Sequence, residues 1–233
     1  MPPVPLAIPG HIAINNVPGG GGFPPPTDED DPCPELQDVI NNIKNQCLKA
    51  MVDIAIQKDI KFDLNNSMKS IFDQNTDFNL NFIDAAPNSF SKPTVDGDTH
   101  IDHSGSTKLA NGRIMLQSMD LSIRMNTNLA TGSKEYVAAT IMHEALHAYL
   151  DFSQTIINQH IDIATNYINS MQQQLLNMFP STLTPDDAFA LAWGGLKDDA
   201  VTLYSRLSTA QKDNITIANK NFKSGAMGQP CTP

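Results

Sequence analysis

The sequence predicts an α+β domain that is mostly helical, with a small sheet upstream of a long apolar helix. Apolar residues recur at helical spacing from residue 35 onward and again from residue 133 to residue 178. Between these stretches, residues 78–82 alternate apolar and polar side chains, and residues 113–117 form a short apolar run. Separate groups of strands and helices along one chain are typical of an α+β fold.

The first 34 residues differ in composition from the rest of the chain. They hold ten of the 16 prolines, a run of glycines at 19–22 and an acidic run at 28–31, with few large apolar side chains. Such a segment cannot bury enough apolar surface to fold, so residues 1–34 are expected to form a flexible linker or arm. Residues 35–233 are long enough for one domain with a sizeable core.

The domain is expected to begin with an amphipathic helix over residues 35–55, followed by the small sheet. In the first predicted strand, Phe78, Leu80 and Phe82 alternate with asparagines, which gives one apolar face. Residues 113–117 form the second strand. The apolar positions of the helix are Leu36, Val39, Ile40, Ile43, Cys47, Leu48, Met51 and Ala55.

A second helix is predicted from residue 133 to about residue 150. Ser133 can cap its N-terminus, and Glu135 in the first turn suits the positive end of the helix dipole. Polar groups on a buried helix are costly unless something binds them, and His143, Glu144 and His147 interrupt this apolar run. Apolar side chains otherwise cover much of the circumference: Tyr136, Val137, Ile141, Met142, Ala145, Leu146, Tyr149 and Leu150.

His143 and His147 are four residues apart and form the pattern H-E-x-x-H. Side chains at i and i+4 lie on one face of an α-helix, so both imidazoles can bind the same metal ion. Glu144 then lies beside the metal, within reach of a water molecule whose proton it can accept. The spacing predicts a catalytic site for one Zn²⁺ per chain, with Glu144 as the general base.

A catalytic zinc site usually has three protein ligands and one open position. No glutamate follows Glu144, which excludes recruitment of a glutamate from a later helix. Leu150 and Ser153 stand where the extended histidine pattern requires glycine and histidine. The third ligand must therefore come from another residue type or another place in the chain.

His160 is the predicted third ligand, because it is the only histidine after His147. It belongs to a helix predicted over residues 157–178, joined to the preceding helix by a tight turn at about 151–155. Asp151 and Asp162 are the alternative ligands. Asp151, four residues after His147, is also placed to orient that histidine by a hydrogen bond.

Three further residues have side chains that could contribute to the site. Tyr167, two turns beyond His160, is a candidate donor to the oxyanion of a tetrahedral intermediate, and a core tyrosine is the alternative interpretation. His100 and His103 are three residues apart and would point to opposite faces of a strand. They are interpreted as loop or rim residues.

At these motifs the chain resembles zincin-fold metallopeptidase domains. Residues 138–150, 160–167 and the A-L-A-W-G-G-L stretch at 190–196 are similar to secreted Bacteroidetes metallopeptidase domains, which often end long surface or Rhs-type polymorphic-toxin proteins. The resemblance covers about residues 35–233 and implies a zincin-like fold. It also implies that residues 113–117 form the sheet edge that aligns a peptide substrate. The three-histidine arrangement is similar to SprT-like domains as well, although the zinc-ribbon cysteines are absent.

Charge and cysteine content limit the partners and the compartment. A net charge of −10 without a basic cluster argues against nucleic acid or anionic lipid, and no apolar run is long enough to span a membrane. The first residues lack the pattern of a secretory signal, so the chain is interpreted as a piece of a longer exported protein. In an exported protein Cys47 can pair with Cys231, leaving Cys33; three free thiols in the cytosol are the alternative.

Three functional hypotheses follow. The first is a zinc-dependent endopeptidase acting on a protein or peptide substrate, secreted or extracellular. The second is the same peptidase delivered into a target cell as a toxin or effector, joined to a carrier protein through residues 1–34. The third is a non-catalytic binding domain that zinc stabilises.

Overall fold

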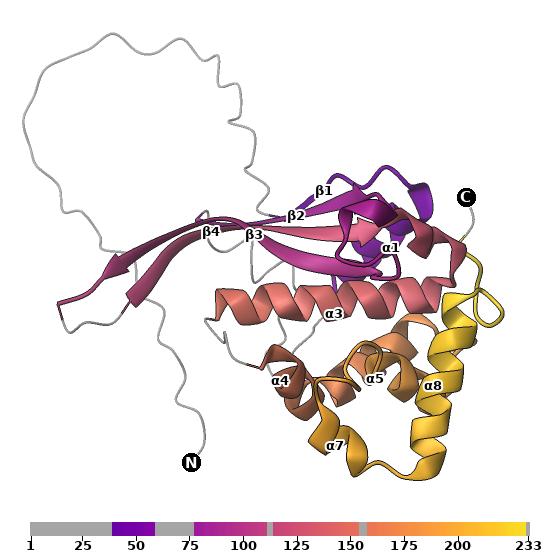
Figure 1. The fold of residues 1–233 in the computed structure, drawn as a ribbon. Coiled ribbons are helices and arrows are strands. Elements are labelled where there is room, and N and C mark those ends of the chain that lie inside the picture. Colours follow the sequence, from indigo (N-terminus) through magenta and orange to yellow (C-terminus); the bar gives the residue numbers. More distant parts are fainter. Residues whose placement is uncertain (1–38, 59–76, 111–113, 154–157, 232–233) are drawn as a thin grey trace, which may run out of the picture. The chain divides into compact units, whose positions relative to one another are not determined.

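The structure is a computed structural model that describes residues 39–58, 77–110, 114–153 and 158–231 (Figure 1). Residues 36–233 form one compact unit. The expected arm at 1–34 lies outside the described residues, as do residues 154–155 of the turn predicted at 151–155, while residues 151–152 still belong to the preceding helix. Within the described residues the fold is α+β, as the sequence predicts.

The sheet has four strands in the order β1-β2-β4-β3. The strands β1, β2 and β4 run parallel, and β3 pairs antiparallel with β4, so β3 is an edge strand. Alternate residues are buried in the first part of β2, and most residues of β4 are buried from Met119 onward. This puts one face of the sheet into the core. The bounds are β1 (Val39–Asn41), β2 (Phe78–Ala85), β3 (Gly97–Lys108) and β4 (Ile114–Asn126).

The helices account for most of the remaining described chain. None of the described helices is both long enough and apolar enough to pass through a bilayer. The α-helices are α1 (Gln46–Ala55), α3 (Lys134–Phe152), α4 (Gln159–Asn166), α5 (Ile168–Met178), α6 (Pro185–Ala192), α7 (Val201–Ser205) and α8 (Thr209–Lys223). Two short 3-10 helices are η1 (Pro87–Ser89) and η2 (Thr127–Thr131).

Helix α3 is the central element of the domain. Figure 1 shows it running along the sheet, with α4, α5, α7 and α8 on its other side, and it contacts β3, β4 and α1 as well as α5, α6 and α8. Burial from both sides explains why it is apolar around most of its circumference. Ser133 caps it by accepting a hydrogen bond from the Tyr136 N–H, and Glu135 lies in its first turn, as predicted.

The first helix begins later than the sequence pattern predicts. Residues 39–41 form strand β1, and α1 starts only at Gln46, where the side chain of Asn45 accepts hydrogen bonds from Cys47 N–H and Leu48 N–H. The prediction of a helix over 35–55 was wrong for its first part. Pairing of β1 with β2, a long-range interaction, overrides the helical spacing there.

Three other expectations about elements need correction. The strand predicted at 113–117 is the start of the much longer β4, of which only residues 119–125 pair with both β2 and β3. Residues 114–116 extend beyond β2 and pair with the last residues of β3, at the opposite end of that strand from Gly97. His100 and His103 lie within strand β3, not in a loop, because this segment pairs along β4. The helix predicted over 157–178 divides at Tyr167, whose φ of −119° departs from the helical value, into α4 and α5.

The C-terminal segment is hydrogen-bonded to the start of α3. Backbone hydrogen bonds run from Lys134 N–H to the Gln229 carbonyl and from Cys231 N–H to the Gly132 carbonyl. The buried Glu135 carboxylate accepts the Gln229 N–H. A disulfide joins Cys231 to Cys47 on α1, which is the pairing expected for an exported protein. Cys33 lies outside the described residues.

The disulfide is expected to stabilise the domain substantially. It closes a loop between residues 184 positions apart, so its loss should lower the free energy of unfolding by about 2 to 5 kcal/mol. Urea unfolding of Cys47→Ser/Cys231→Ser beside the wild type measures this, with Cys33→Ser as the matched control. A double variant as stable as the control would show that the bridge contributes nothing.

Candidate metal centre

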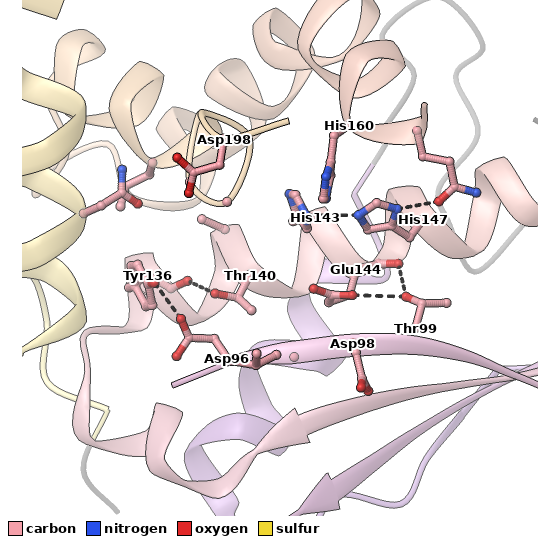
Figure 2. Close-up of a pocket in the computed structure, with 18 of the residues that line it drawn as sticks. Asp96, Asp98, Thr99, Tyr136, Thr140, His143, Glu144, His147, His160 and Asp198 are labelled. Atoms are coloured by element: carbon pink, nitrogen blue, oxygen red, sulfur yellow. Dashed lines mark hydrogen bonds between the residues drawn. The ribbon is translucent and has the colours of Figure 1, made fainter. Parts of the chain in front are cut away.

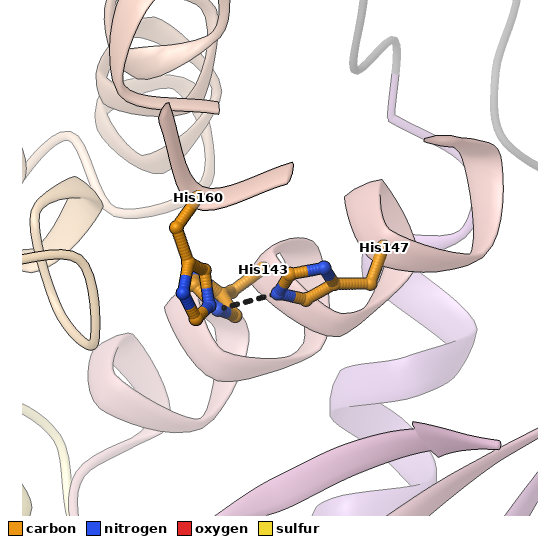
Figure 3. Close-up of side chains that lie close together, drawn as sticks. All are labelled: His143, His147 and His160. Atoms are coloured by element: carbon orange, nitrogen blue, oxygen red, sulfur yellow. Dashed lines mark hydrogen bonds between the residues drawn. The ribbon is translucent and has the colours of Figure 1, made fainter. Parts of the chain in front are cut away.

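Three histidine side chains converge in the folded domain (Figure 3). His143 and His147 come from α3 and His160 from the first turn of α4, and one ring nitrogen of each lies within 4.8 Å of the others. The Nε2 atoms of His143 and His147 are 3.1 Å apart. Two nitrogen ligands of a tetrahedral zinc ion are separated by about 3.3 Å, so this pair already has nearly the required spacing.

The start of α4 places His160 opposite α3. Asn158 adopts the left-handed conformation (φ 58°), which asparagine tolerates better than most residues, and its carbonyl accepts the N–H groups of Ile161 and Asp162. The first turn of the helix is thereby fixed next to the end of α3. The prediction that His160 would face His147 is confirmed.

Hydrogen bonds to the Nδ1 atoms orient two of the rings. His147 Nδ1 lies 2.6 Å from the amide oxygen of Gln159, and the Gln159 amide nitrogen donates to Asp151 Oδ1 at 2.6 Å. Since the Asp151 carboxylate only accepts, Gln159 must present its oxygen to His147, and His147 must be protonated at Nδ1. Its Nε2 lone pair is then available for a metal ion.

Asp199 acts on His160 in the same way. Its Oδ2 atom lies 2.5 Å from His160 Nδ1, so the carboxylate holds the proton on that nitrogen and leaves Nε2 to face the other rings. Asp151 thus reaches His147 only through Gln159, in place of the direct contact expected from sequence. Gln159 and Asp199 were not predicted, because each is distant in sequence from the histidine that it orients.

The surroundings of His143 and His147 favour the neutral imidazole, which is the form that a metal requires. Burial lowers the pKa of His143 well below its ordinary value, and the neighbouring His147 and His160 lower it further. Burial also lowers the pKa of His147, against the opposing effect of Gln159. Neutral imidazole is the form that binds metal, so the donor set suits a zinc ion.

One glycine of the A-L-A-W-G-G-L stretch, Gly195, lies against the ring of His143. Gly195 has a φ of +80°, and a Cβ built there would lie 3.4 Å from the Cε1 atom of His143. The backbone of the loop after α6 therefore packs against the His143 ring, which a side chain at this position would crowd. Trp193, in the same stretch, is buried in the core.

Glu144 lies next to the triad, between α3 and the edge strand β3 (Figure 2). Thr99 Oγ1 lies 3.2 Å from its Oε2 atom and donates to its main-chain carbonyl at 2.8 Å. Gly97 allows the close approach, since a Cβ there would lie 3.1 Å from Glu144 Cγ. Glu144 is adjacent to the three histidines but is not part of the group that could hold a metal, as its predicted role requires.

Burial raises the pKa of Glu144 to about 8, although the Thr99 hydrogen bond opposes the shift. Asp98 and Asp96 raise it further. A divalent cation at the triad would favour the carboxylate and bring this pKa down. A base whose pKa lies near neutral pH is well suited to accept a proton and return it.

The triad and Glu144 open into a cavity of about 660 Å³. Its walls come from the start of β3 and the segment before it, one face of α3, the start of α4, and the loop after α6. Side chains on its polar surface that the sequence did not single out are Asp96, Asp98, Thr99, Thr140, Gln159, Asp198 and Asn219.

The structure does not bring every candidate to this cavity. Tyr167 is buried in the core, in edge contact with the Tyr149 ring, and does not line the cavity. This matches the alternative interpretation and does not support an oxyanion role. Asp162 accepts a hydrogen bond from Asn166 on its own helix and is not part of the triad. His100 and His103 are exposed on β3.

The raised pKa of Glu144 gives a pH-dependent prediction for the metal-free protein. The folded state takes up a proton at Glu144 between the ordinary value of 4.5 and about 8, so this group's contribution to stability falls as pH rises through that window. Glu144→Gln removes the effect. Without metal, the free energy of unfolding of the variant should exceed that of the wild type by about 2 to 4 kcal/mol at pH 8, and by much less at pH 5. Urea unfolding at both pH values, with chelator present, measures the difference; a pH-independent difference would contradict it.

Comparison with known proteins gave no relative. A scan with protein-family models, a search of curated proteins and a search of solved structures each returned no match to this chain. The chemistry of the site must therefore support the functional interpretation by itself.

Proposed function

We propose that this protein is a zinc-dependent endopeptidase in which His143, His147 and His160 hold the metal and Glu144 is the general base. One observation supports this above all: three imidazoles converge beside a buried carboxylate, at the wall of an open cavity. A purely structural zinc site has no need of such a carboxylate, and usually has four protein ligands.

The proposed chemistry is hydrolysis of a peptide bond. Zinc, when bound, would polarise the peptide carbonyl and make an attacking water more acidic. Glu144 accepts the proton of that water, and the same carboxyl group then delivers the proton to the departing amide nitrogen. Thr99 holds Glu144 against β3 through both transfers.

The edge strand β3 is the part of the sheet best placed to align an extended substrate. Its first residues lie beside Glu144, and one of its sides is not paired with another strand of the sheet. An extended peptide can add to such an edge through backbone hydrogen bonds. We therefore assign to Gly97–Lys108 the aligning role that the resemblance suggested for residues 113–117.

The disulfide supports export. Disulfides persist in oxidising compartments and are rare in the cytosol, so the Cys47–Cys231 bridge favours a secreted or extracellular site of action.

Metal removal and reconstitution test the proposal. The wild-type protein should hold one zinc per chain by mass spectrometry and digest casein. Treatment with 1,10-phenanthroline should stop digestion, and added zinc should restore it. One zinc per chain without cleavage of casein or of a peptide library would instead favour a zinc-stabilised binding domain. A reconstituted protein without zinc would exclude the metal site itself.

A further inference from the structure

The cavity is strongly acidic beyond the catalytic Glu144. Four aspartates line it, and no lysine or arginine of the described residues does. They come from three parts of the chain: the start of β3 with the residue before it, the end of α3, and the loop after α6. These aspartates are Asp96, Asp98, Asp151 and Asp198.

Three of the four are already paired. Asp98 binds Arg124 through both carboxylate oxygens, at 2.7 and 2.5 Å. Asp151 accepts from Gln159. Asp96 accepts from the Tyr136 hydroxyl and the Lys223 ammonium, and both contacts involve its Oδ2 atom, so Oδ1 has no such donor among the described residues.

Asp198 is different. It has no hydrogen bond or ion pair with any residue that the structure describes, although it lines the cavity. Figure 2 shows it beyond the histidines, on the side where Tyr136, Thr140 and Asp96 lie. Its place is well defined, because the same loop packs Gly195 against His143 and binds His160 through Asp199. Asp198 is exposed to solvent, so this loop presents an unpaired, accessible carboxylate in the cavity wall.

We propose that this recess binds a cationic group of the peptide substrate, with Asp198 as the residue that determines specificity. The inference rests on the proposed peptidase function and names its substrate class. A lysine ammonium or arginine guanidinium entering the recess would pair with Asp198, and Asp96 Oδ1 would add to the negative potential. The neighbouring acids Asp98 and Asp151 are balanced by their own partners.

The dimensions of the site limit where the cationic residue can stand. Tyr136 and His143 are seven residues apart on α3, which corresponds to about 10 Å along the helix. An extended peptide advances about 3.3 Å per residue. A cationic residue bound near Tyr136 would therefore stand about three positions from the scissile bond, which sets the range of positions to scan.

Quenched fluorescent peptides test this with the zinc-loaded protein. Each set shares one sequence and differs at a single position by lysine, arginine, the neutral glutamine or glutamate, scanned across three positions on each side of the bond cleaved. The wild type should cleave the best lysine or arginine peptide with a kcat/KM about tenfold or more above its glutamine counterpart. The preference should shrink as ionic strength rises.

Substitution at Asp198 supplies the decisive comparison. Asp198→Asn should bring the cation preference to within about twofold of unity, by lowering kcat/KM for the lysine and arginine peptides. Asp198→Lys should favour the glutamate peptide. Asp213→Asn, at an exposed carboxylate on α8 outside the cavity, is the matched control and should behave as the wild type.

The positive charge could come from a basic side chain or from the N-terminal amine of the peptide, and blocking the N-terminus distinguishes the two sources. N-acetylated peptides with an internal lysine test a side chain, and free N-terminal peptides without basic residues test an α-amine. A preference in either set that depends on Asp198 supports the subsite and identifies its ligand. Cleavage without charge preference, or a preference that Asp198→Asn retains, would overturn this inference alone. No cleavage of any peptide would overturn the proposed function and this inference with it.

Discussion

Glu144→Gln is expected to lower peptide hydrolysis by about 10²- to 10⁴-fold while the protein keeps one zinc per chain. Glutamine matches the shape of glutamate and can still contact Thr99, but it cannot accept the proton of the attacking water. Since Glu144 is not one of the three metal ligands, zinc affinity should change little. Parallel measurement of kcat/KM on a quenched peptide and of zinc content by mass spectrometry separates the two effects.

The metal-free stability of the same variant distinguishes a lost base from a damaged fold. Glu144→Gln should be at least as stable as the wild type without metal, because it removes a carboxyl group that is costly to ionise in a buried position. Glu135→Gln is a useful contrast, because it changes the other buried glutamate of α3, which binds the C-terminal segment rather than lining the cavity. Undiminished hydrolysis by Glu144→Gln would refute the mechanism.

His160→Ala is expected to weaken zinc binding by more than about 100-fold and to abolish hydrolysis with it. Loss of an outer hydrogen bond to a metal ligand typically costs 10- to 100-fold in affinity, and loss of the ligand itself should cost more. Asp199→Asn provides the graded comparison, since it disturbs only the hydrogen bond that orients His160. Competition against a chromophoric chelator gives all three affinities.

His100→Ala serves as the matched control for His160→Ala. His100 is an exposed histidine on β3, outside the triad, and its removal should leave zinc affinity and hydrolysis unchanged. If His160→Ala retained wild-type affinity, the third ligand would have to be another group, and the convergence of the three rings would have no catalytic meaning.

The sequence predicted helix α3 well because the relevant signals are local. The cap at Ser133 acts within one turn, and the spacing of His143 and His147 becomes proximity on any α-helix. The capping box of Ser208 with Gln211, which begins α8, is an equally local signal. His160 could be proposed by elimination, but only the packing of α4 against α3 placed it.

Local signals failed where distant segments compete with them. Val39 and Ile40 fit a helical pattern, yet they pair with β2, some forty residues away. Tyr167 was a candidate by its spacing from His160 and lies in the core instead, because the helix divides at this residue. Neither outcome can be read from periodicity, since each depends on which surfaces the rest of the chain buries.

By itself, the sequence determined the chemistry on α3: two imidazoles, one carboxylate and the helix that holds them together. Only the tertiary structure decided the surroundings of that chemistry. Thr99 reaches Glu144 across 45 residues, and Asp199 reaches His160 across 39. Helical geometry fixes distances between near neighbours, whereas contacts over such separations exist only after the sheet and helices have packed their apolar faces against α3.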